Sequence, residues 1–231
     1  MADRRKRIWI TRTEPAASST AVEVRDRGFD PWVMPLLEVR PLTAEPLDLT
    51  GVGALAFTSN NGVRAFCALS AERQIRVFAV GAATAKAAWA AGFRRVLSSD
   101  RDVSVMAQGI IERKRELTGV VLYPGALEPA GDLVSVLKPH GIEAREIPVY
   151  DTCPTDLTDA QLAQMADMDV ALIHSAKAAQ VLADLLARHP LPRLGIAGLS
   201  RAAVQPLAQS AVAWTRVAAT PLEATLLDLI G

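Results

Sequence analysis

The stretch from Ala54 to Phe66, ALAFTSNNGVRAF, changes its character at one polar turn. Its first four residues are apolar, residues 58–62 are polar or glycine, and apolar residues then return at helical spacing. This order predicts a buried strand, a turn and an amphipathic helix. Ser and Asn are favoured at helix starts, where their side chains accept hydrogen bonds from unpaired backbone N–H groups. The turn is therefore either an ordinary helix cap or part of a binding site.

The same alternation of apolar runs and helical patterns continues along the chain. It predicts an α/β fold with parallel sheets that are covered by helices on both faces. The expected strands are 8–11, 30–35, 54–58, 76–80, 95–97, 120–123, 143–150, 170–174, 194–197 and 213–217. The expected helices are 16–27, 62–69, 83–91, 103–114, 132–140, 159–166, 176–187, 201–210 and 222–230.

The sequence also contains an internal duplication. Residues 170–182, VALIHSAKAAQVL, repeat the pattern of the first stretch and align Ser175 with Ser59. Two further pairs of segments match in the same order and at nearly the same separation, 27–39 with 140–152 and 76–93 with 193–211. This recurrence predicts two similar lobes of flavodoxin-like type, each built around a parallel sheet.

Two long extended segments, 32–41 and 143–154, are bounded by prolines, which favour extended backbone and end helices. Side by side they would form a two-stranded hinge between the lobes. The first lobe would then be discontinuous and comprise residues 1–36 plus 153–231, and the second would comprise residues 37–152. A plain tandem pair of lobes is the alternative topology.

Composition and charge restrict the classes of function. The 231 residues include 25 Lys or Arg and 25 Asp or Glu, and this balance argues against a bulk nucleic-acid binder. The apolar run Ile8–Ile10 behind the basic N-terminal residues is too short for a signal peptide or a membrane span. The two cysteines lack metal-like spacing and suit a reducing compartment. We therefore expect a cytoplasmic protein with no nucleic-acid or membrane partner.

Polar or glycine-rich turns follow six of the expected strands, where ligands of parallel sheets bind. Each turn alone is explained as a helix cap or as close glycine packing. Together they would line a cleft with N–H groups, which suits a ligand rich in carboxylates or phosphates. The glycine spacing fits neither a P-loop nor a dinucleotide-binding loop. The candidate substrate-binding residues are Thr11, Arg12, Thr58, Ser59, Asn60, Gly81, Ala82, Thr84, Gly125, His174, Ser175, Ala176, Lys177, Gly198, Ser200 and Arg201.

Tyr150 is the candidate catalytic residue. It lies in the expected hinge, where its hydroxyl would point into the cleft as a hydrogen-bond donor or general acid. The alternative is a packed aromatic whose hydroxyl is satisfied locally. Tyr123, at the end of an expected buried strand, is the weaker candidate. The three histidines have no metal-ligand spacing, so no metal site is expected.

Several motifs resemble the uroporphyrinogen-III synthase family. In family order they are ITR at 10–12, FTSNNGV at 57–63, VFAVGAATAKAAWAAGF at 77–93, GIEAREIPVYDT at 141–152, DVALIHSAK at 169–177 and TPLEATLLDLI at 220–230. The sequence departs from the family pattern at two turns. The usual FTS of the second copy is Ile173-His174-Ser175, and the usual GPxTA is Gly198-Leu199-Ser200-Arg201-Ala202.

The resemblance implies two α/β lobes with a two-stranded connector and a cofactor-free hydro-lyase of tetrapyrrole and heme biosynthesis. Such an enzyme closes hydroxymethylbilane to uroporphyrinogen III, with loss of water and inversion of ring D through a spiro intermediate. The resemblance assigns substrate contacts to Ser59, Asn60, Gly81, Thr84, Ser175 and Lys177, and the catalytic position to Tyr150. The abundance of N–H-lined turns would match the eight carboxylates of the substrate.

Partners follow from the same interpretation. We expect a monomer whose small-molecule substrate passes to it in a transient hand-over from hydroxymethylbilane synthase. A two-lobed protein that binds a carboxylate-rich small molecule without chemistry is the alternative from another class. It would use the same duplicated lobes and hinge.

Overall fold

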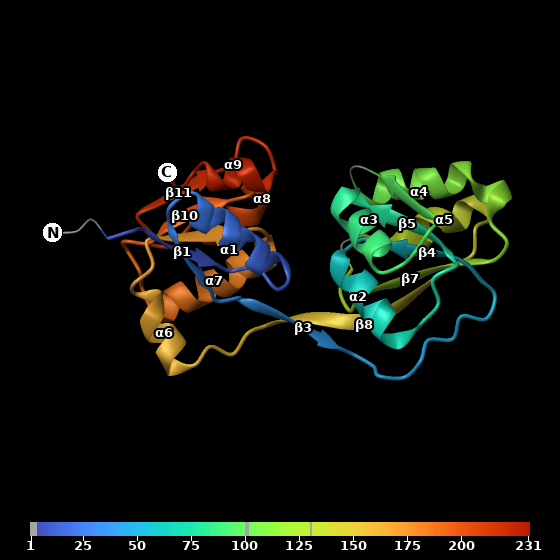
Figure 1. Ribbon diagram of the computed structural model, residues 1–231, viewed down its shortest axis with the longest axis horizontal. Coiled ribbons are helices and arrows are strands. Elements are labelled where there is room, and N and C mark those ends of the chain that lie inside the picture. Colours follow the sequence, from blue (N-terminus) through green and yellow to red (C-terminus); the bar gives the residue numbers. More distant parts are fainter. Residues whose placement is uncertain (1–3, 100–101, 130) are drawn as a thin grey trace. The chain divides into compact units, whose positions relative to one another are not determined.

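The computed structural model describes residues 4–99, 102–129 and 131–231. The chain divides into two compact units, Met1–Glu38 with Cys153–Gly231 (unit 1) and Val39–Thr152 (unit 2) (Figure 1). Each unit contains its own sheet, and the predicted α/β class with parallel sheets is confirmed. Residues 1–3, 100–101 and 130 of the predicted domains lie outside the described residues.

The sheet of unit 1 has the order β11-β10-β9-β1-β2, and every neighbouring pair is parallel. Its strands are β1 (Arg7–Ile10), β2 (Asp30–Val33), β9 (Val170–Ile173), β10 (Gly195–Gly198) and β11 (Trp214–Val217). The helices of unit 1 are α1 (Ala16–Asp26), α6 (Asp159–Met165), α7 (Ala176–Arg188), α8 (Arg201–Val204), the 3₁₀ turn η3 (Gln205–Leu207) and α9 (Glu223–Leu227).

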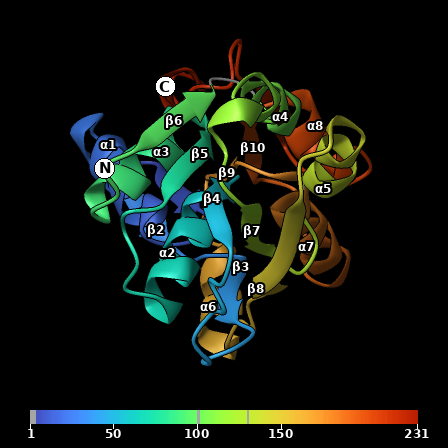
Figure 2. The same ribbon diagram turned by 90° about the vertical axis from the view of Figure 1, so that its right-hand side faces the viewer.

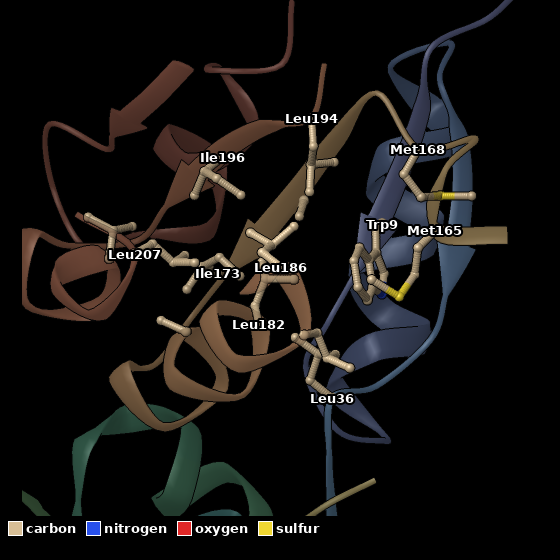
Figure 3. Close-up of a cluster of buried hydrophobic side chains, with 14 of the residues drawn as sticks. Trp9, Leu36, Met165, Met168, Ile173, Leu182, Leu186, Leu194, Ile196 and Leu207 are labelled. Atoms are coloured by element: carbon tan, nitrogen blue, oxygen red, sulfur yellow. The ribbon is translucent and has the colours of Figure 1, made fainter. Parts of the chain in front are cut away.

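Alternate residues of β1 pack on opposite faces of this sheet, as the period of a strand requires. Ile8 and Ile10 pack in the core beneath α1 and α9. Trp9 packs on the other face with side chains of α6 and α7, and its indole N–H donates to the carbonyl of Met34 at 2.7 Å. Figure 3 shows this second core, with Trp9 beside Met165. Both faces of the sheet are therefore covered.

The sheet of unit 2 has the order β3-β8-β7-β4-β5-β6. Its strands are β3 (Leu37–Pro41), β4 (Val52–Phe57), β5 (Arg76–Val80), β6 (Val96–Ser99), β7 (Val120–Ala126) and β8 (Ala144–Pro154). Its helices are α2 (Asn60–Leu69), α3 (Gly81–Ala90), α4 (Val103–Glu112), η1 (Lys114–Glu116), α5 (Leu133–Leu137) and η2 (Lys138–His140). Helices α2 and α3 cover one face of the sheet, and α4 and α5 cover the other (Figure 2).

Strands β3 and β8 carry the chain between the two units and are neighbours in the sheet. The N–H of Leu42 donates to Val149 at 3.1 Å, and the N–H of Thr155 donates to Leu36 at 3.0 Å. Residue numbers rise along one segment as they fall along the other, so the two segments are antiparallel. The expected extended segments therefore pair with each other.

Three expected helices are shorter than the apolar pattern predicted. The helix expected at 201–210 ends as α8 at Val204 and continues as η3, and that expected at 132–140 ends as α5 at Leu137 and continues as η2. Proline lies in the first turn of both 3₁₀ segments and has no N–H to continue an α-helix. The helix expected at 222–230 is only α9.

The turn predicted at Gly125 is wrong. Strand β7 continues to Ala126, and Gly125 pairs with Pro148 of β8. A Cβ atom at Gly125 would lie 3.2 Å from the ring of Tyr123. The glycine therefore allows a close approach of the tyrosine ring within the strand, and it does not supply a turn.

Candidate active site

The strand order of the unit 2 sheet reverses between β4 and β7, and the carboxyl ends of these two strands form its topological switch point. These two strands are neighbours, and the strands that follow them lie on opposite sides, β5 beside β4 and β8 beside β7. Ligands of open parallel sheets bind at such switch points. The residues Thr58 and Ser59 directly follow β4, so the sequence-predicted turn lies at this position.

Ser59 begins α2 as its N-cap. Its backbone is extended, with φ −153° and ψ 157°, and its Oγ accepts a hydrogen bond from the N–H of Gly62 at 3.1 Å. Gly62 is required because a Cβ atom there would lie 2.9 Å from the carbonyl oxygen of Pro124 in β7. Helix α2 therefore starts close against β7. Asn60, predicted in the turn, is the first residue of the helix.

Strand β8 brings Tyr150 to the same cap. The Tyr150 hydroxyl lies 2.8 Å from Ser59 Oγ, and either atom can be the donor. Tyr150 is 6% exposed. Burial raises the pKa of the Tyr150 phenol above its usual range, and the hydrogen bond to Ser59 offsets part of that rise. The phenol is therefore protonated at neutral pH and able to donate.

A second hydroxyl pair lies one residue earlier in the chain. Thr58 Oγ1 and the Tyr123 hydroxyl are 2.9 Å apart. The pKa of the Tyr123 phenol is raised, chiefly by burial. The hydrogen bond to Thr58 lowers this pKa, and the charges of Glu146 and Tyr150 raise it. Thr58 also lines a cavity of about 480 Å³. The other residues that line this cavity are Val80, Asp102, Val103, Ser104, Gly131, Asp132 and Val136.

The two acidic residues of this cavity are already used as helix caps. Asp102 Oδ1 accepts hydrogen bonds from the N–H groups of Ser104 and Val105 at 2.9 and 3.1 Å, at the start of α4. Asp132 accepts from the N–H of Ser135 at 2.9 Å, at the start of α5. The hydrogen bonds with Ser135 hold the pKa of Asp132 below its usual range. The starts of α4 and α5 are therefore neutralised by the chain's own carboxylates.

Helix α3 begins differently. Its N-cap is Val80, which provides no side-chain hydrogen bond, and Gly81 has φ +76°, a conformation that glycine adopts readily. The N–H groups of the first turn thus have no side-chain cap. Ala82 is exposed and Thr84 is buried on the inner side of the same helix. The start of α3 is suited to an anion.

In unit 1, the two predicted turn serines are both helix caps. Ser175 Oγ accepts from the N–H of Ala178 at 3.2 Å at the start of α7, and Ser200 Oγ accepts from the N–H of Ala203 at 3.1 Å at the start of α8. Ala176 and Lys177 are exposed in the first turn of α7, and Arg201 is exposed in α8. Gly198 is buried, and a Cβ atom there would lie 2.0 Å from Val204 Cγ1.

The switch point of unit 1 lies between β1 and β9, because β2 and β10 follow them on opposite sides. Thr11, directly after β1, is buried and donates to the carbonyl of Leu172 in β9 at 2.6 Å. Arg12 Nη1 donates to Glu223 Oε2 at 3.0 Å and to Thr20 Oγ1 at 3.4 Å. His174 Nε2 lies 3.2 and 3.1 Å from the two oxygens of Glu223.

Sequence reasoning proposed Arg12 and His174 as separate contacts and missed Glu223, which joins them. Thr20 donates to the other Glu223 oxygen, Oε1, at 2.5 Å. Because a carboxylate only accepts, His174 Nε2 carries the proton of their hydrogen bond. His174 Nδ1 is buried without a hydrogen-bond partner in the described part of the chain. An acidic residue in the first turn of a helix is common, so its position gave no signal of this role.

The cluster changes the acidity of Glu223. Burial alone would raise its pKa, but the hydrogen bonds and charge of His174, the hydrogen bond from Thr20 and the charge of Arg12 outweigh burial and lower the pKa to about 2. Glu223 is thus ionised at neutral pH. Two of the sequence-predicted contacts of unit 1, Arg12 and His174, are therefore organised around one partly buried anion.

The described residues include neither a candidate metal site nor a membrane-spanning helix. No group of three or more His, Cys, Asp or Glu side chains there is placed to hold a metal ion. In the same part of the chain, no helix has the length and hydropathy needed to cross a bilayer.

Two parallel-sheet units with hydroxyl and charged groups at their switch points make this a two-unit α/β protein of the kind that binds small molecules at its strand ends. The sequence model of the family described as Uroporphyrinogen-III synthase HemD matches residues 18–228. The chain therefore belongs to the uroporphyrinogen-III synthase family. Membership makes it a hydro-lyase of porphyrin and heme biosynthesis.

Solved structures agree on the fold. A uroporphyrinogen-III synthetase from Helicobacter pylori is 19% identical, with 98% of each chain covered and a TM-score of 0.70. A mutant uroporphyrinogen III synthase from Thermus thermophilus is 14% identical, with 97% of each chain covered and a TM-score of 0.53. A search of curated proteins found no match.

Proposed function

We propose that this chain closes hydroxymethylbilane to uroporphyrinogen III, with loss of water and inversion of ring D through a spiro intermediate. The observation that carries the proposal is the hydrogen-bonded pair of Ser59 and Tyr150 at the switch point of unit 2. Family membership supports the reaction class, and this pair would supply a proton donor at a switch point, where ligands of parallel sheets bind.

The first step breaks the bond between the hydroxymethyl carbon and its oxygen. The leaving oxygen takes up a proton as it departs as water, and the pyrrole nitrogen supplies electrons to the carbon left behind. The phenol of Tyr150 can donate this proton because it is neutral at physiological pH. Ser59 fixes the phenol by its hydrogen bond and can relay a proton to it. Tyr150 would thus act as the general acid.

Ring closure then depends on which carbon of ring D attacks. Attack by the substituted carbon gives the spiro intermediate, and rearrangement followed by loss of a proton from carbon gives the type III isomer. That proton returns to the phenolate, so the enzyme ends in its starting state. The bonds that are broken and formed in these steps involve no net oxidation or reduction, so the reaction needs no redox cofactor. Holding the flexible chain in one conformation is the main catalytic task.

The carboxylates of the substrate would be held by two kinds of group. One is the backbone N–H array of helix starts, especially α3 at Gly81 to Thr84, whose first turn lacks a side-chain cap. The other is cationic, with Arg12, Lys177 and Arg201 near the strand ends of unit 1. The remaining sequence-predicted contacts in the turns, including Asn60, His174, Ser175 and Ser200, belong to the same proposal.

We also propose that the two units are duplicated lobes and that β3 and β8 form the hinge between them. Counted from β2, the sheet order in unit 1 is β2-β1-β9-β10-β11, and counted from β8, which lies next to the edge strand β3, the order in unit 2 is β8-β7-β4-β5-β6. The segments that align in sequence occupy the same places in these two orders, as a duplication requires. The monomeric state and the hand-over from hydroxymethylbilane synthase are further parts of this proposal.

The test is a product assay. The protein is incubated with freshly prepared hydroxymethylbilane, the product is oxidised, and the porphyrin isomers are separated by chromatography. We expect the type III isomer in excess over the type I isomer that forms without enzyme. Type I alone overturns the synthase reaction, and type I together with tight binding of the tetrapyrrole supports the non-catalytic binding protein.

A further inference from the structure

We infer that Glu223 is a positioning residue that holds Arg12 by one nitrogen and so presents the opposite edge of its guanidinium to a carboxylate of the substrate. The inference rests on the proposed function for the identity of the substrate, and it assigns a role to a residue outside the predicted site.

The hydrogen bonds of Arg12 are all made by one atom. Nη1 donates to Glu223 at 3.0 Å and to Thr20 at 3.4 Å. In the described part of the chain, Nε and Nη2 have no hydrogen-bond partner. These two nitrogens form the side edge of the guanidinium, which matches the two oxygens of a carboxylate. The Arg12 side chain as a whole is 32% exposed, so solvent and small molecules reach part of it.

Glu223 is saturated by groups from separate segments of unit 1. Oε1 receives hydrogen bonds from Thr20 in α1 and His174 after β9, and Oε2 receives them from Arg12 after β1 and from His174. Both carboxylate oxygens therefore have two hydrogen-bond donors from the protein, and the Glu223 side chain is only 24% exposed. Glu223 therefore fixes Arg12 at the end of β1, which is one of the two strands of the switch point.

Other contacts already hold helix α9, so anchoring the helix does not account for Glu223. Leu226, Leu227 and Ile230 are buried in the core of unit 1. Arg27 Nη1 forms an ion pair with Asp228 Oδ1 at 2.8 Å. Asp228, the C-cap of α9, is thus a nearby carboxylate that pairs with an arginine other than Arg12, and it provides a matched control.

The first experiment compares Glu223→Gln, Arg12→Gln and the double variant in the type III product assay. We expect each single variant to raise KM about tenfold, because that is the factor for one lost charge-assisted contact. The kcat of each should stay within about twofold of the wild-type value. Because Glu223 acts through Arg12, the double variant should be no worse than Arg12→Gln alone. Asp228→Asn should keep the wild-type KM. Independent effects that multiply in the double variant, or an unchanged KM in Glu223→Gln, overturn the inference.

A further variant, Arg12→Lys, and a binding measurement test the same contact in other ways. Arg12→Lys retains the charge and loses the paired edge, so its KM should rise as in Arg12→Gln; a wild-type KM in this variant overturns the bidentate contact. Equilibrium binding of uroporphyrin III, followed by tryptophan fluorescence, tests the same ranking without turnover. If the wild-type protein forms only the type I isomer, the proposed reaction is refuted. The binding measurement can still be made in that case, and the ranking of the Arg12 and Glu223 variants then decides this inference by itself. Circular dichroism of each variant confirms that it is folded.

Discussion

Ser59 uses a single oxygen atom for two tasks. Its Oγ accepts the N–H of Gly62 and so caps α2, and the same atom meets the hydroxyl of Tyr150 at 2.8 Å. A cap of this kind contributes about 1 kcal/mol to stability. The helix cap and the proposed catalytic contact are therefore the same group, and the two explanations of the turn do not exclude each other.

Replacing Tyr150 with Phe tests the hydroxyl of this pair. The ring is buried and stays in place, while the proton donor is lost. We expect kcat for type III formation to fall by about a hundredfold, the lower range for general acid catalysis, and KM to change little. Steady-state kinetics with isomer analysis measures both values.

The matched control for this variant is Tyr123→Phe, which removes the other buried phenol. Tyr123 contacts Thr58, while the Ser59 cap and Tyr150 remain intact in that variant. Its kcat should fall by less than that of Tyr150→Phe. Equal losses in both variants, or wild-type turnover in Tyr150→Phe, would remove Tyr150 from the proposed chemistry.

The depressed pKa of Glu223 makes a prediction about stability and pH. The folded-state pKa is about 2, below the ordinary value of 4.5, so ionised Glu223 stabilises the folded state. This contribution is complete above about pH 4.5 and is lost as pH falls through about 2. After allowance for solvent screening, we expect Glu223→Gln to lower the free energy of unfolding by about 1 to 2 kcal/mol at pH 7.

Denaturant unfolding of the wild type and Glu223→Gln at a series of pH values checks this. The difference between the two proteins should shrink as pH is lowered from about 5 toward 2. A difference that stays constant over that interval would contradict an ionised Glu223 at the centre of the cluster. Asp228→Asn, which breaks an exposed ion pair, should differ from the wild type by less than about 1 kcal/mol throughout.

Glu223 also shows why part of the site was not predictable from the sequence. The polar turns after the strands were found because their chemistry is local, as with Ser59 and Ser175. Two of the partners of Glu223, Arg12 and Thr20, lie at the far end of the chain. The carboxylate itself resembles any acid in the first turn of a helix. Only the sheet order brings β1 and the start of α9 into one place.

At the scale of elements, α2 depends on a glycine. A Cβ atom at Gly62 would lie 2.9 Å from the Pro124 carbonyl oxygen of β7, and neither backbone can move without disturbing the sheet contact. We expect Gly62→Ala to destabilise the protein by about 1 to 3 kcal/mol, the range for overpacking. The shift of α2 should also weaken the contact of Ser59 with Tyr150 and lower kcat. Thermal unfolding and kinetics measure these effects.

Gly109 in α4 is the matched glycine control. It is also inside a helix, and a Cβ atom there would meet nothing within 4 Å. Gly109→Ala should therefore stabilise the protein by about 0.5 to 1 kcal/mol through helix propensity. If both alanine variants change stability in the same direction, close packing of α2 on β7 is not the reason for Gly62.

The elements were predictable where an apolar run stood between polar turns. β4, β9 and β5 lie within a residue or two of their expected places for that reason. The pattern failed where backbone chemistry overruled it, as at the prolines that end α5 and α8. It failed again at Gly125, because pairing with β8 extended β7 past an apparent turn.

At the scale of the molecule, the apolar cores follow the division into units. Two clusters of buried side chains belong to unit 1, and two belong to unit 2. Among the described residues, none of these clusters draws side chains from both units. Each unit therefore has the means to unfold cooperatively by itself.

Calorimetry tests this independence. We expect two thermal transitions, since each unit buries its own core, and destabilising one core should shift one transition only. Leu182→Ala in the core of unit 1 should cost about 2 to 5 kcal/mol and lower one transition. Gly62→Ala should lower the other. A single transition that both variants shift alike would show that the units unfold as one, and the proposal of a hinge between independent lobes would then lose its thermodynamic basis.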